Sequence, residues 1–225
     1  MADGRRIVVT GALGALGGAL VATAVARGWR VAGVDYAPAR PERPETLGGV
    51  DLSNPDAAGA AMAQAAERLG GGIDALACVA GGFAWETIGD GSPATWERMF
   101  RLNIGVTLAS VQAALPHIAA PGGAIVLVGA GAALKAGAGM GAYGASKAGV
   151  HRLAEALAEE QKARGIRVNA VLPSIIDTPA NRADMPQADH SAWVTPAELA
   201  EAMLFLLSPT ASGVTGALLP VSGRV

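Results

Sequence analysis

Short apolar runs alternate with longer segments of helical pattern along the whole chain, and this alternation restricts the possible folds more than any other feature. The apolar runs cover residues 5–10, 29–35, 74–80, 123–129, 166–172 and 217–222. The intervening segments that predict helices cover residues 16–28, 54–70, 94–118, 144–165 and 195–208. Because the apolar runs lack polar alternation, we expect strands buried on both faces of a parallel sheet. The order of elements therefore predicts a doubly wound α/β domain.

The size and composition predict a single soluble domain spanning residues 1–225. Apolar residues make up 51% of the chain and charged residues 16%, which argues against disorder. Gly, Pro and charged residues interrupt the apolar stretches well short of the length of a membrane span. The first ten residues lack the pattern of a signal peptide. We therefore expect a cytoplasmic protein without a membrane partner.

The distribution of charge and of metal-ligating residue types argues against two further classes, nucleic-acid-binding proteins and metalloproteins. The net charge is −2 and the Lys and Arg residues are scattered, so we expect no nucleic acid partner. The single cysteine, Cys78, excludes an intramolecular disulfide, and its apolar surroundings predict buried packing. His117, His151 and His190 are dispersed along the chain, so we expect no metal site.

The first apolar run leads directly into a glycine-rich turn at residues 10–18, which is followed by a predicted helix. Gly11 permits a tight turn, Gly14 lets the backbone approach a pyrophosphate, and Gly17 lets helix and strand pack closely. The N-terminus of the helix supplies free N–H groups to phosphates. The spacing G-x-x-G-x-x-G therefore predicts a dinucleotide site, although glycines also serve as simple turn residues.

Asp35 ends the second apolar run, where a carboxylate accepts hydrogen bonds from the adenosine ribose. A carboxylate there repels a 2′-phosphate, so we expect NAD(H) more than NADP(H). Arg40 and Arg43 follow closely and can moderate that preference. Asp51 either contacts the adenine edge or caps the helix that starts at residues 54–55.

Tyr143 and Lys147 stand four residues apart in a predicted helix, so their side chains share one face. A neighbouring ammonium favours the ionised phenol, and such a tyrosine can act as a general acid or base. The alternative is that the tyrosine packs and the lysine is a solvated charge. The pair indicates a catalytic role only if other residues of the chain form a site around it.

Together, these motifs resemble the short-chain dehydrogenase/reductase family over nearly the whole chain. The matching features are the turn at 10–17, Asp35, residues 78–82, Asn103, the Tyr143/Lys147 pair and residues 173–178. The resemblance implies a Rossmann-like three-layer α/β/α sandwich with a mainly parallel sheet. It also implies hydride transfer between a nicotinamide and a small-molecule substrate, and assembly as a homodimer or homotetramer.

The resemblance implies a role for each matching residue. Tyr143 is the proton donor or acceptor, and Lys147 lowers its pKa and binds the nicotinamide ribose. Asn103 holds a water of the proton relay, and Thr178 binds the nicotinamide amide or the pyrophosphate. The expected cofactor-binding set is Gly11, Leu13, Gly14, Ala15, Leu16, Asp35, Asp51, Ala80, Gly81, Gly82, Asn103, Tyr143, Lys147, Pro173, Ser174, Ile176 and Thr178.

Ala130 departs from the family pattern, because family members usually carry a serine there that donates a hydrogen bond to the substrate oxygen. Ser146 lies on the predicted helix of Tyr143 and is expected to pack rather than to replace that serine. The dihydropteridine reductase branch resembles this chain in lacking the serine, in residues 78–82 and in residues 171–193. In that branch the acceptor is conjugated and easily reduced, so it needs less stabilisation of developing charge.

Three hypotheses follow for the function. The first is an NADH-dependent reductase of a small pterin-like or quinonoid acceptor, and the second is a general NAD-dependent alcohol/ketone dehydrogenase. The third is a catalytically impaired nucleotide-binding protein of the same fold. In each, residues 179–195 form a substrate lid. For Trp85, Met140, Met185 and Trp193 there are two alternatives: these side chains line a flat, largely apolar substrate pocket, or they pack in the core or at an interface.

Overall fold

Seven parallel strands form one sheet in the computed structural model, which describes residues 4–225. The spatial order is β3-β2-β1-β4-β5-β6-β7. The strands are β1 (Arg6–Thr10), β2 (Arg30–Val34), β3 (Thr46–Leu47), β4 (Ala75–Cys78), β5 (Ala124–Val128), β6 (Arg167–Pro173) and β7 (Leu218–Val221). The order reverses between β1 and β4, and ligands of open α/β sheets bind at such a point. Residues 1–3 of the expected domain lie outside the described residues.

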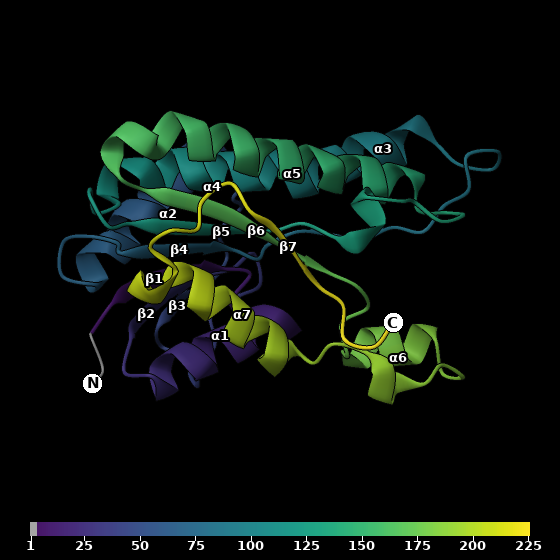
Figure 1. The fold of residues 1–225 in the computed structure, drawn as a ribbon, viewed down its shortest axis with the longest axis horizontal. Coiled ribbons are helices and arrows are strands. Elements are labelled where there is room, and N and C mark those ends of the chain that lie inside the picture. The colour runs from purple at the N-terminus through teal and green to yellow at the C-terminus, as the bar shows by residue number, and fades with distance from the viewer. Residues whose placement is uncertain (1–3) are drawn as a thin grey trace.

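Helices cover both faces of the sheet, as Figure 1 shows. On one face lie α1 (Ala15–Ala26) and α7 (Pro196–Leu207), and on the other lie α2 (Pro55–Arg68), α4 (Val106–Ala114) and α5 (Gly141–Gln161). Shorter elements are α3 (Pro93–Phe100), α6 (Pro179–Asp184), a π-helical turn (Arg101–Gly105) and 3₁₀ turns at Leu115–His117, Gly131–Ala133, Lys162–Arg164, His190–Ala192 and Pro209–Ala211. The predicted three-layer α/β/α fold is confirmed.

The side chains of successive strand residues belong to two separate hydrophobic cores, one on each face of the sheet. Val8 of β1 packs with Met62 of α2, whereas the neighbouring Val9 packs with Leu20 of α1. This arrangement explains why the strand segments are apolar without alternation, since both faces are covered. Cys78 is buried in β4, and burial raises the pKa of its thiol to about 12, so the predicted packing role is confirmed.

The segment 94–118 is not one helix. It divides into α3, the π-helical turn, α4 and a 3₁₀ turn. The π-helical turn contains Asn103, whose side chain bonds to the backbone of Gly82 on a different segment. A π-helical turn widens the helix by one residue, and such turns are frequent at functional sites.

Two segments outside the predicted strands and helices contain regular structure. Thr46–Leu47 follows the Pro-rich residues 37–45 and forms the edge strand β3, which is too short to leave a periodic signal. Residues 173–196 contain α6 and a 3₁₀ turn, and Thr178 caps α6 by accepting from the N–H of Asn181 (3.2 Å). A bridge between Ile176 and Val194 closes the base of this segment.

Candidate active site

The glycine turn brings three backbone segments into contact at the carboxyl end of β1. Gly11 adopts a positive φ of 67°, and a Cβ on it would lie 2.9 Å from the backbone nitrogen of Ala80. A Cβ on Gly17 would lie 2.0 Å from the carbonyl oxygen of Gly11. Gly14, the N-cap of α1, has no side chain to accept from the first-turn N–H groups. These groups suit a phosphate, as the sequence predicted.

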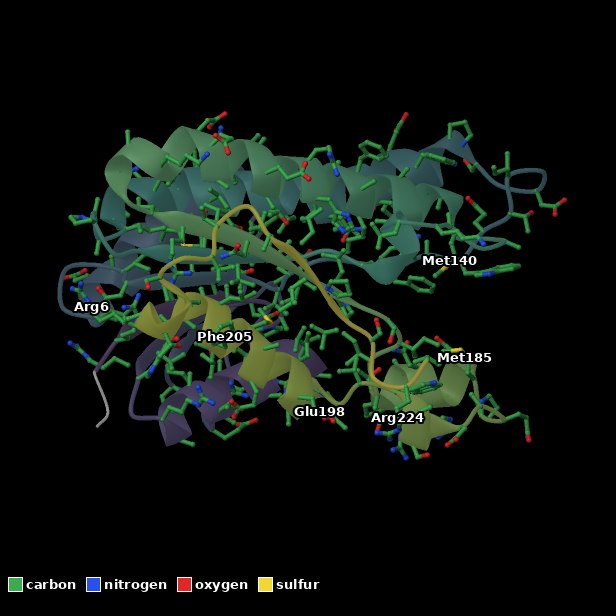
Figure 2. The ribbon with its side chains drawn as sticks, viewed as in Figure 1. Arg6, Met140, Met185, Glu198, Phe205 and Arg224 are labelled. Atoms are coloured by element: carbon green, nitrogen blue, oxygen red, sulfur yellow. The ribbon has the colours of Figure 1, made fainter. Side chains whose placement is uncertain are left out.

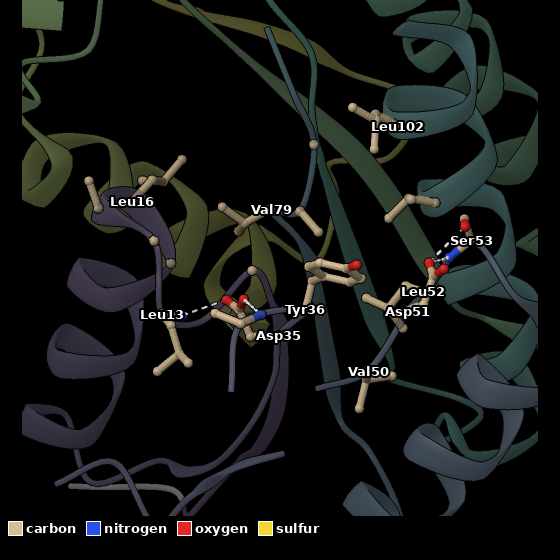
Figure 3. A pocket seen from close by; sticks show the side chains of 18 of the residues that line it. Leu13, Leu16, Asp35, Tyr36, Val50, Asp51, Leu52, Ser53, Val79 and Leu102 are labelled. Atoms are coloured by element: carbon tan, nitrogen blue, oxygen red, sulfur yellow. Dashed lines mark hydrogen bonds between the residues drawn. The ribbon is translucent and has the colours of Figure 1, made fainter. Parts of the chain in front are cut away.

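A cavity of about 800 Å³ lies beside this turn, at the carboxyl ends of β1, β2 and β4 (Figure 3). Its volume and its position at the reversal of strand order suit a dinucleotide. The predicted residues that line it are Gly11, Leu13, Gly14, Ala15, Leu16, Asp35, Asp51, Ala80 and Gly81. Further lining residues are Gly17, Tyr36, Ala37, Arg40, Val50, Leu52, Ser53, Val79, Arg101, Leu102 and Val106.

Sequence reasoning missed most of this second group. Tyr36, Ala37 and Val79 directly follow strand ends, so their position in the chain was a usable signal. Arg101 and Leu102 reach the cavity because the π-helical turn places them there, and the helical pattern alone did not indicate that.

The Asp35 carboxylate is held toward the cavity by the backbone. Its Oδ2 accepts from the N–H of Leu13 (2.8 Å) and its Oδ1 from the N–H of Ala37 (2.8 Å). Each carboxylate oxygen has a second lone pair for a ribose hydroxyl. Arg40 lines the cavity, whereas Arg43 is paired with Glu45 (2.6 Å).

Asp51 contacts the cavity and does not cap α2. Its Oδ1 accepts from the N–H and the hydroxyl of Ser53 (2.9 and 2.7 Å), and these bonds lower the pKa of Asp51 (Figure 3). Asn54 caps α2 instead, accepting from the N–H groups of Asp56 and Ala57. Of the two alternatives for Asp51, the capping role is therefore wrong.

Tyr143 and Lys147 lie one turn apart on α5, and burial dominates both pKa values. The Lys147 ammonium donates to the carbonyl of Val128 (2.8 Å) and lies 6.0 Å from the centre of the Tyr143 ring. Burial raises the pKa of Tyr143 to about 12 and lowers the pKa of Lys147 to about 8. The expectation that Lys147 lowers the tyrosine pKa is thus not met, because loss of hydration outweighs the distant cation.

Asn103 is fully buried and connects α5 to Gly82, the residue after the cavity-lining Gly81. Its amide donates to Gly82 (3.1 Å) and to the hydroxyl of Ser146 (2.9 Å), while its Oδ1 accepts from the N–H of Gly82 (3.0 Å). A Cβ on Gly81 would lie 2.7 Å from Oδ1 of Asn103 and 3.5 Å from Nζ of Lys147. Gly81 therefore connects the cavity to the polar groups of α5.

Residues 173–178 lie apart from the cavity lining. Pro173 ends β6 beside Val221, and the hydroxyl of Ser174 donates to the carbonyl of Ser222 (2.7 Å). Ile176 forms a bridge to Val194 and Thr178 caps α6. Gly82, Asn103, Tyr143 and Lys147 also lie outside the lining, and the contacts of Gly81 link this second group to the cavity.

Known proteins share both the sequence and the fold. A family model described as "Enoyl-(Acyl carrier protein) reductase" matches residues 11–223. The cis-4-hydroxycyclohexanecarboxylate dehydrogenase of Sinomonas cyclohexanicum is 34% identical over 97% of this chain and 95% of that protein. A short-chain dehydrogenase/reductase structure from Brucella melitensis, titled glucose/ribitol dehydrogenase, superimposes with a TM-score of 0.89 at 30% identity, covering 98% of this chain and 96% of that one. The chain belongs to the short-chain dehydrogenase/reductase family.

A short-chain dehydrogenase/reductase is an oxidoreductase that uses NAD(P)(H). The L-rhamnose 1-dehydrogenase (NAD(P)(+)) of Sphingomonas sp. (strain SKA58) is 31% identical over 98% of this chain and 96% of that protein. The glycine turn, the uncapped start of α1 and Asp35 fit the pyrophosphate and ribose of such a cofactor. Within residues 4–225, no helix combines the length and apolar character that crossing a membrane requires.

Proposed function

We propose that this oxidoreductase reduces a small, planar, conjugated acceptor of pterin-like or quinonoid type, with NADH as the preferred donor and Tyr143 as the proton donor. Ala130 is the observation that carries the proposal. The residue is 3% exposed, and its methyl group has no hydrogen to donate to a substrate oxygen. Ser146 is no substitute, because its hydroxyl donates to the Tyr143 carbonyl (2.8 Å) and accepts from Asn103.

The chain's own residues then divide the work of binding and proton transfer. The nicotinamide cofactor supplies the hydride when bound. The turn at 11–17 holds its pyrophosphate, and Asp35 accepts from the ribose hydroxyls and disfavours a 2′-phosphate. Lys147 binds the second ribose and orients Tyr143, and Asn103 keeps the adjoining backbone in place.

The raised pKa of Tyr143 supports the reductive direction. A phenol with a pKa of about 12 stays protonated at neutral pH, so it is ready to donate a proton. Oxidation of an alcohol requires the same group as a phenolate. The resting protonation state therefore matches the donor role that the proposal gives to Tyr143, and the phenolate left after proton transfer has the Lys147 ammonium 6.0 Å from its ring centre as a counter-charge.

Two exposed aromatic side chains near the start of α5 support a planar substrate. Phe83, which is 52% exposed, packs edge-on against the Tyr143 ring at 5.0 Å. Trp85 is 61% exposed, and a Cβ on Gly139 would lie 2.2 Å from its ring, so one ring face rests on backbone. Aromatic rings that are held on one side and open on the other suit stacking with a flat substrate.

The proposed lid, residues 179–195, lies at the end of the molecule where α5 begins (Figure 1). Figure 2 shows Met140, which precedes α5, and Met185, which follows α6, on facing sides of the same end of the molecule. Trp193 is buried and packs on His190 with ring centres 4.5 Å apart. Of the four side chains expected to line the substrate pocket, Trp193 therefore packs, and the other three remain candidates for substrate contact.

A second candidate function is a general NAD-dependent alcohol/ketone dehydrogenase in which a water replaces the serine. The names of the relatives above, which are dehydrogenases of a cyclic hydroxy acid and a sugar, favour it. The third candidate is a catalytically impaired nucleotide-binding protein, which the same Ala130 motivates.

A substrate panel with three proteins tests these candidates. Wild type is assayed with NADH and NADPH on a quinonoid dihydropterin, a quinone and simple ketones. Tyr143→Phe should abolish turnover and keep NADH binding, whereas Ala130→Ser should raise ketone turnover and change dihydropterin turnover little. Good ketone turnover with negligible reduction of both conjugated acceptors would reject the first candidate. A wild type without turnover on any acceptor would favour the third.

We also propose a homodimer or homotetramer. Phe100 and Leu108 are large apolar side chains that are exposed on α3 and α4. Such side chains suit burial against a second copy of the chain. Light scattering after gel filtration measures the mass, and a monomer at micromolar concentration would contradict this.

A further inference from the structure

His151 is a buried histidine of α5 that the proposed mechanism does not use. It is 2% exposed and follows Lys147 by one helical turn, as Lys147 follows Tyr143. Residues four apart lie on one side of a helix, so these three side chains form a continuous stripe. A buried imidazole at the end of such a stripe needs a partner for its polar atoms.

The partner of His151 is the backbone at the position where the family usually carries serine. The N–H of Ala130 donates to Nε2 of His151 (3.3 Å). A Cβ on Gly129 would lie 2.4 Å from the same nitrogen, so the edge of the ring rests directly on the Gly129 backbone. The imidazole therefore occupies the space that a side chain at residue 129 would fill.

Lys147 holds the same backbone segment through Val128, the residue before Gly129. Its ammonium donates to the carbonyl of Val128 (2.8 Å), and the N–H of Gly129 donates to Val171 of β6 (2.9 Å). Residues 128–130 are thus fixed by two side chains of α5 and by the neighbouring strand. A shift of this segment would remove the acceptor that holds Lys147 in place.

We propose that His151 is a positioning residue: its neutral ring holds residues 128–130, and through them Lys147, and protonation of the ring at acidic pH releases this segment and stops the reaction. This inference rests on the proposed reductase function for its kinetic part. Its structural part concerns the hydrogen bond itself and stands without a substrate.

The chemistry of imidazole explains the switch. Nε2 can accept from the Ala130 N–H only while it carries a lone pair, whereas a protonated ring presents N–H groups at both nitrogens. Burial, Arg152 and Lys147 lower the pKa of His151, and Glu155 opposes them. Residues 128–134 contain no titratable side chain, and the elements that pack on α5 bring Glu97, Arg98, Arg101, Lys162, Arg164 and Arg167. Neutral pH therefore keeps the ring neutral.

A nuclear magnetic resonance experiment tests the hydrogen bond without turnover. Long-range ¹H–¹⁵N correlations of the imidazoles are recorded from about pH 5 to 8, the range in which histidine titrates. The His151 signals are identified by their loss in His151→Gln, with His117→Gln as a control. We expect a neutral ring with its proton on Nδ1, and a shift of the Ala130 amide signal as the ring titrates. A proton on Nε2 at pH 7, or an Ala130 signal independent of His151, would overturn the proposal.

Kinetics with two variants tests the positioning role. His151→Gln can still accept from Ala130 but does not titrate, so it should keep wild-type turnover at pH 7.5 and lose the acidic fall in kcat. His151→Leu fills similar space without an acceptor and should lower kcat about tenfold, as loss of one hydrogen bond predicts, and should also weaken NADH binding, because Lys147 is the residue proposed to bind the second ribose. An acidic fall that persists unchanged in His151→Gln, or a wild-type kcat in a folded His151→Leu, would reject the role. If no acceptor is turned over, the proposed function fails and the resonance experiment alone decides on His151.

Discussion

Replacing Gly17 by alanine tests the closest backbone approach in the dinucleotide site. The new Cβ would lie 2.0 Å from the oxygen and 2.7 Å from the carbon of the Gly11 carbonyl. Neither atom belongs to a flexible side chain, so the turn and α1 must separate, at a cost of about 1–3 kcal/mol for overpacking. The better helix propensity of alanine returns up to ~1 kcal/mol. At roughly 2–4 °C per kcal/mol for a chain of this size, Tm should fall by several degrees.

The adjacent Gly18 supplies a matched control in the same helix. A Cβ on Gly18 would lie at ordinary contact distances, 3.6 Å from the end of the flexible Arg43 side chain and 3.8 Å from the carbonyl oxygen of Ala12, so Gly18→Ala should be stabilising by about 0.5–1 kcal/mol. Thermal melts and urea unfolding measure stability, and nicotinamide fluorescence measures NADH affinity, which should fall in Gly17→Ala because the distorted turn is the phosphate site. A Gly17→Ala protein that melts with Gly18→Ala and binds NADH like wild type would refute the reasoning.

Three further predictions concern charge and polar contacts. Asp35→Asn removes the charge that disfavours a 2′-phosphate, so the ratio of kcat/KM for NADPH to that for NADH should rise about tenfold, which is 1.4 kcal/mol; an unchanged ratio would contradict this. Ser146→Ala removes an acceptor of the Asn103 amide, so it should cost about 1–3 kcal/mol of stability and lower kcat. The control is the buried Ser110, whose hydroxyl donates to the Val106 carbonyl in its own helix, and Ser110→Ala should keep kcat. Because the pKa of Lys147 is about 8 in the folded chain, below its ordinary 10.5, the unfolded chain alone holds this proton between those values, and Lys147 should contribute a rise in the free energy of unfolding of up to roughly 3 kcal/mol as the pH increases through that range. Cys78 and Tyr143, whose pKa values are raised, lower the stability of any variant that keeps them at alkaline pH, so the measurement is the difference between wild type and Lys147→Met in urea unfolding from pH 7 to 10, which should grow in favour of wild type.

The layers of the fold were predictable because each strand and each main helix carries its own pattern. The six long apolar runs became β1, β2 and β4–β7, and four of the five helical segments became α1, α2, α5 and α7. The glycine turn and Asp35 were predictable for a similar reason, since their chemistry depends on backbone freedom and charge at a strand end. Such features are local, and a sequence displays local features directly.

The remaining features depend on contacts between distant segments. The π-helical turn follows from bonds between Asn103 and Gly82, which lie 21 positions apart. His151 looked like one scattered histidine because its partner is a backbone N–H, and backbone groups leave no residue-type signal in a sequence. The pKa of Tyr143 was expected to fall because its neighbour was known and its burial was not.

Ala130 and the pKa of Tyr143 set two energetic costs that the chemistry must meet. A missing donor at the substrate oxygen costs about 2.7–4 kcal/mol of transition-state stabilisation in other enzymes. Ionising a tyrosine with a pKa of about 12 at pH 7 costs roughly 7 kcal/mol, against roughly 4 kcal/mol for an ordinary tyrosine. The first cost is smallest when the acceptor spreads its developing charge over a conjugated ring. The second cost is met before the reaction when Tyr143 acts as a base, and during proton transfer when it acts as a donor, because giving the proton leaves a phenolate. Reduction of a conjugated acceptor therefore lowers the first cost, and the Lys147 ammonium is the group that can offset the second.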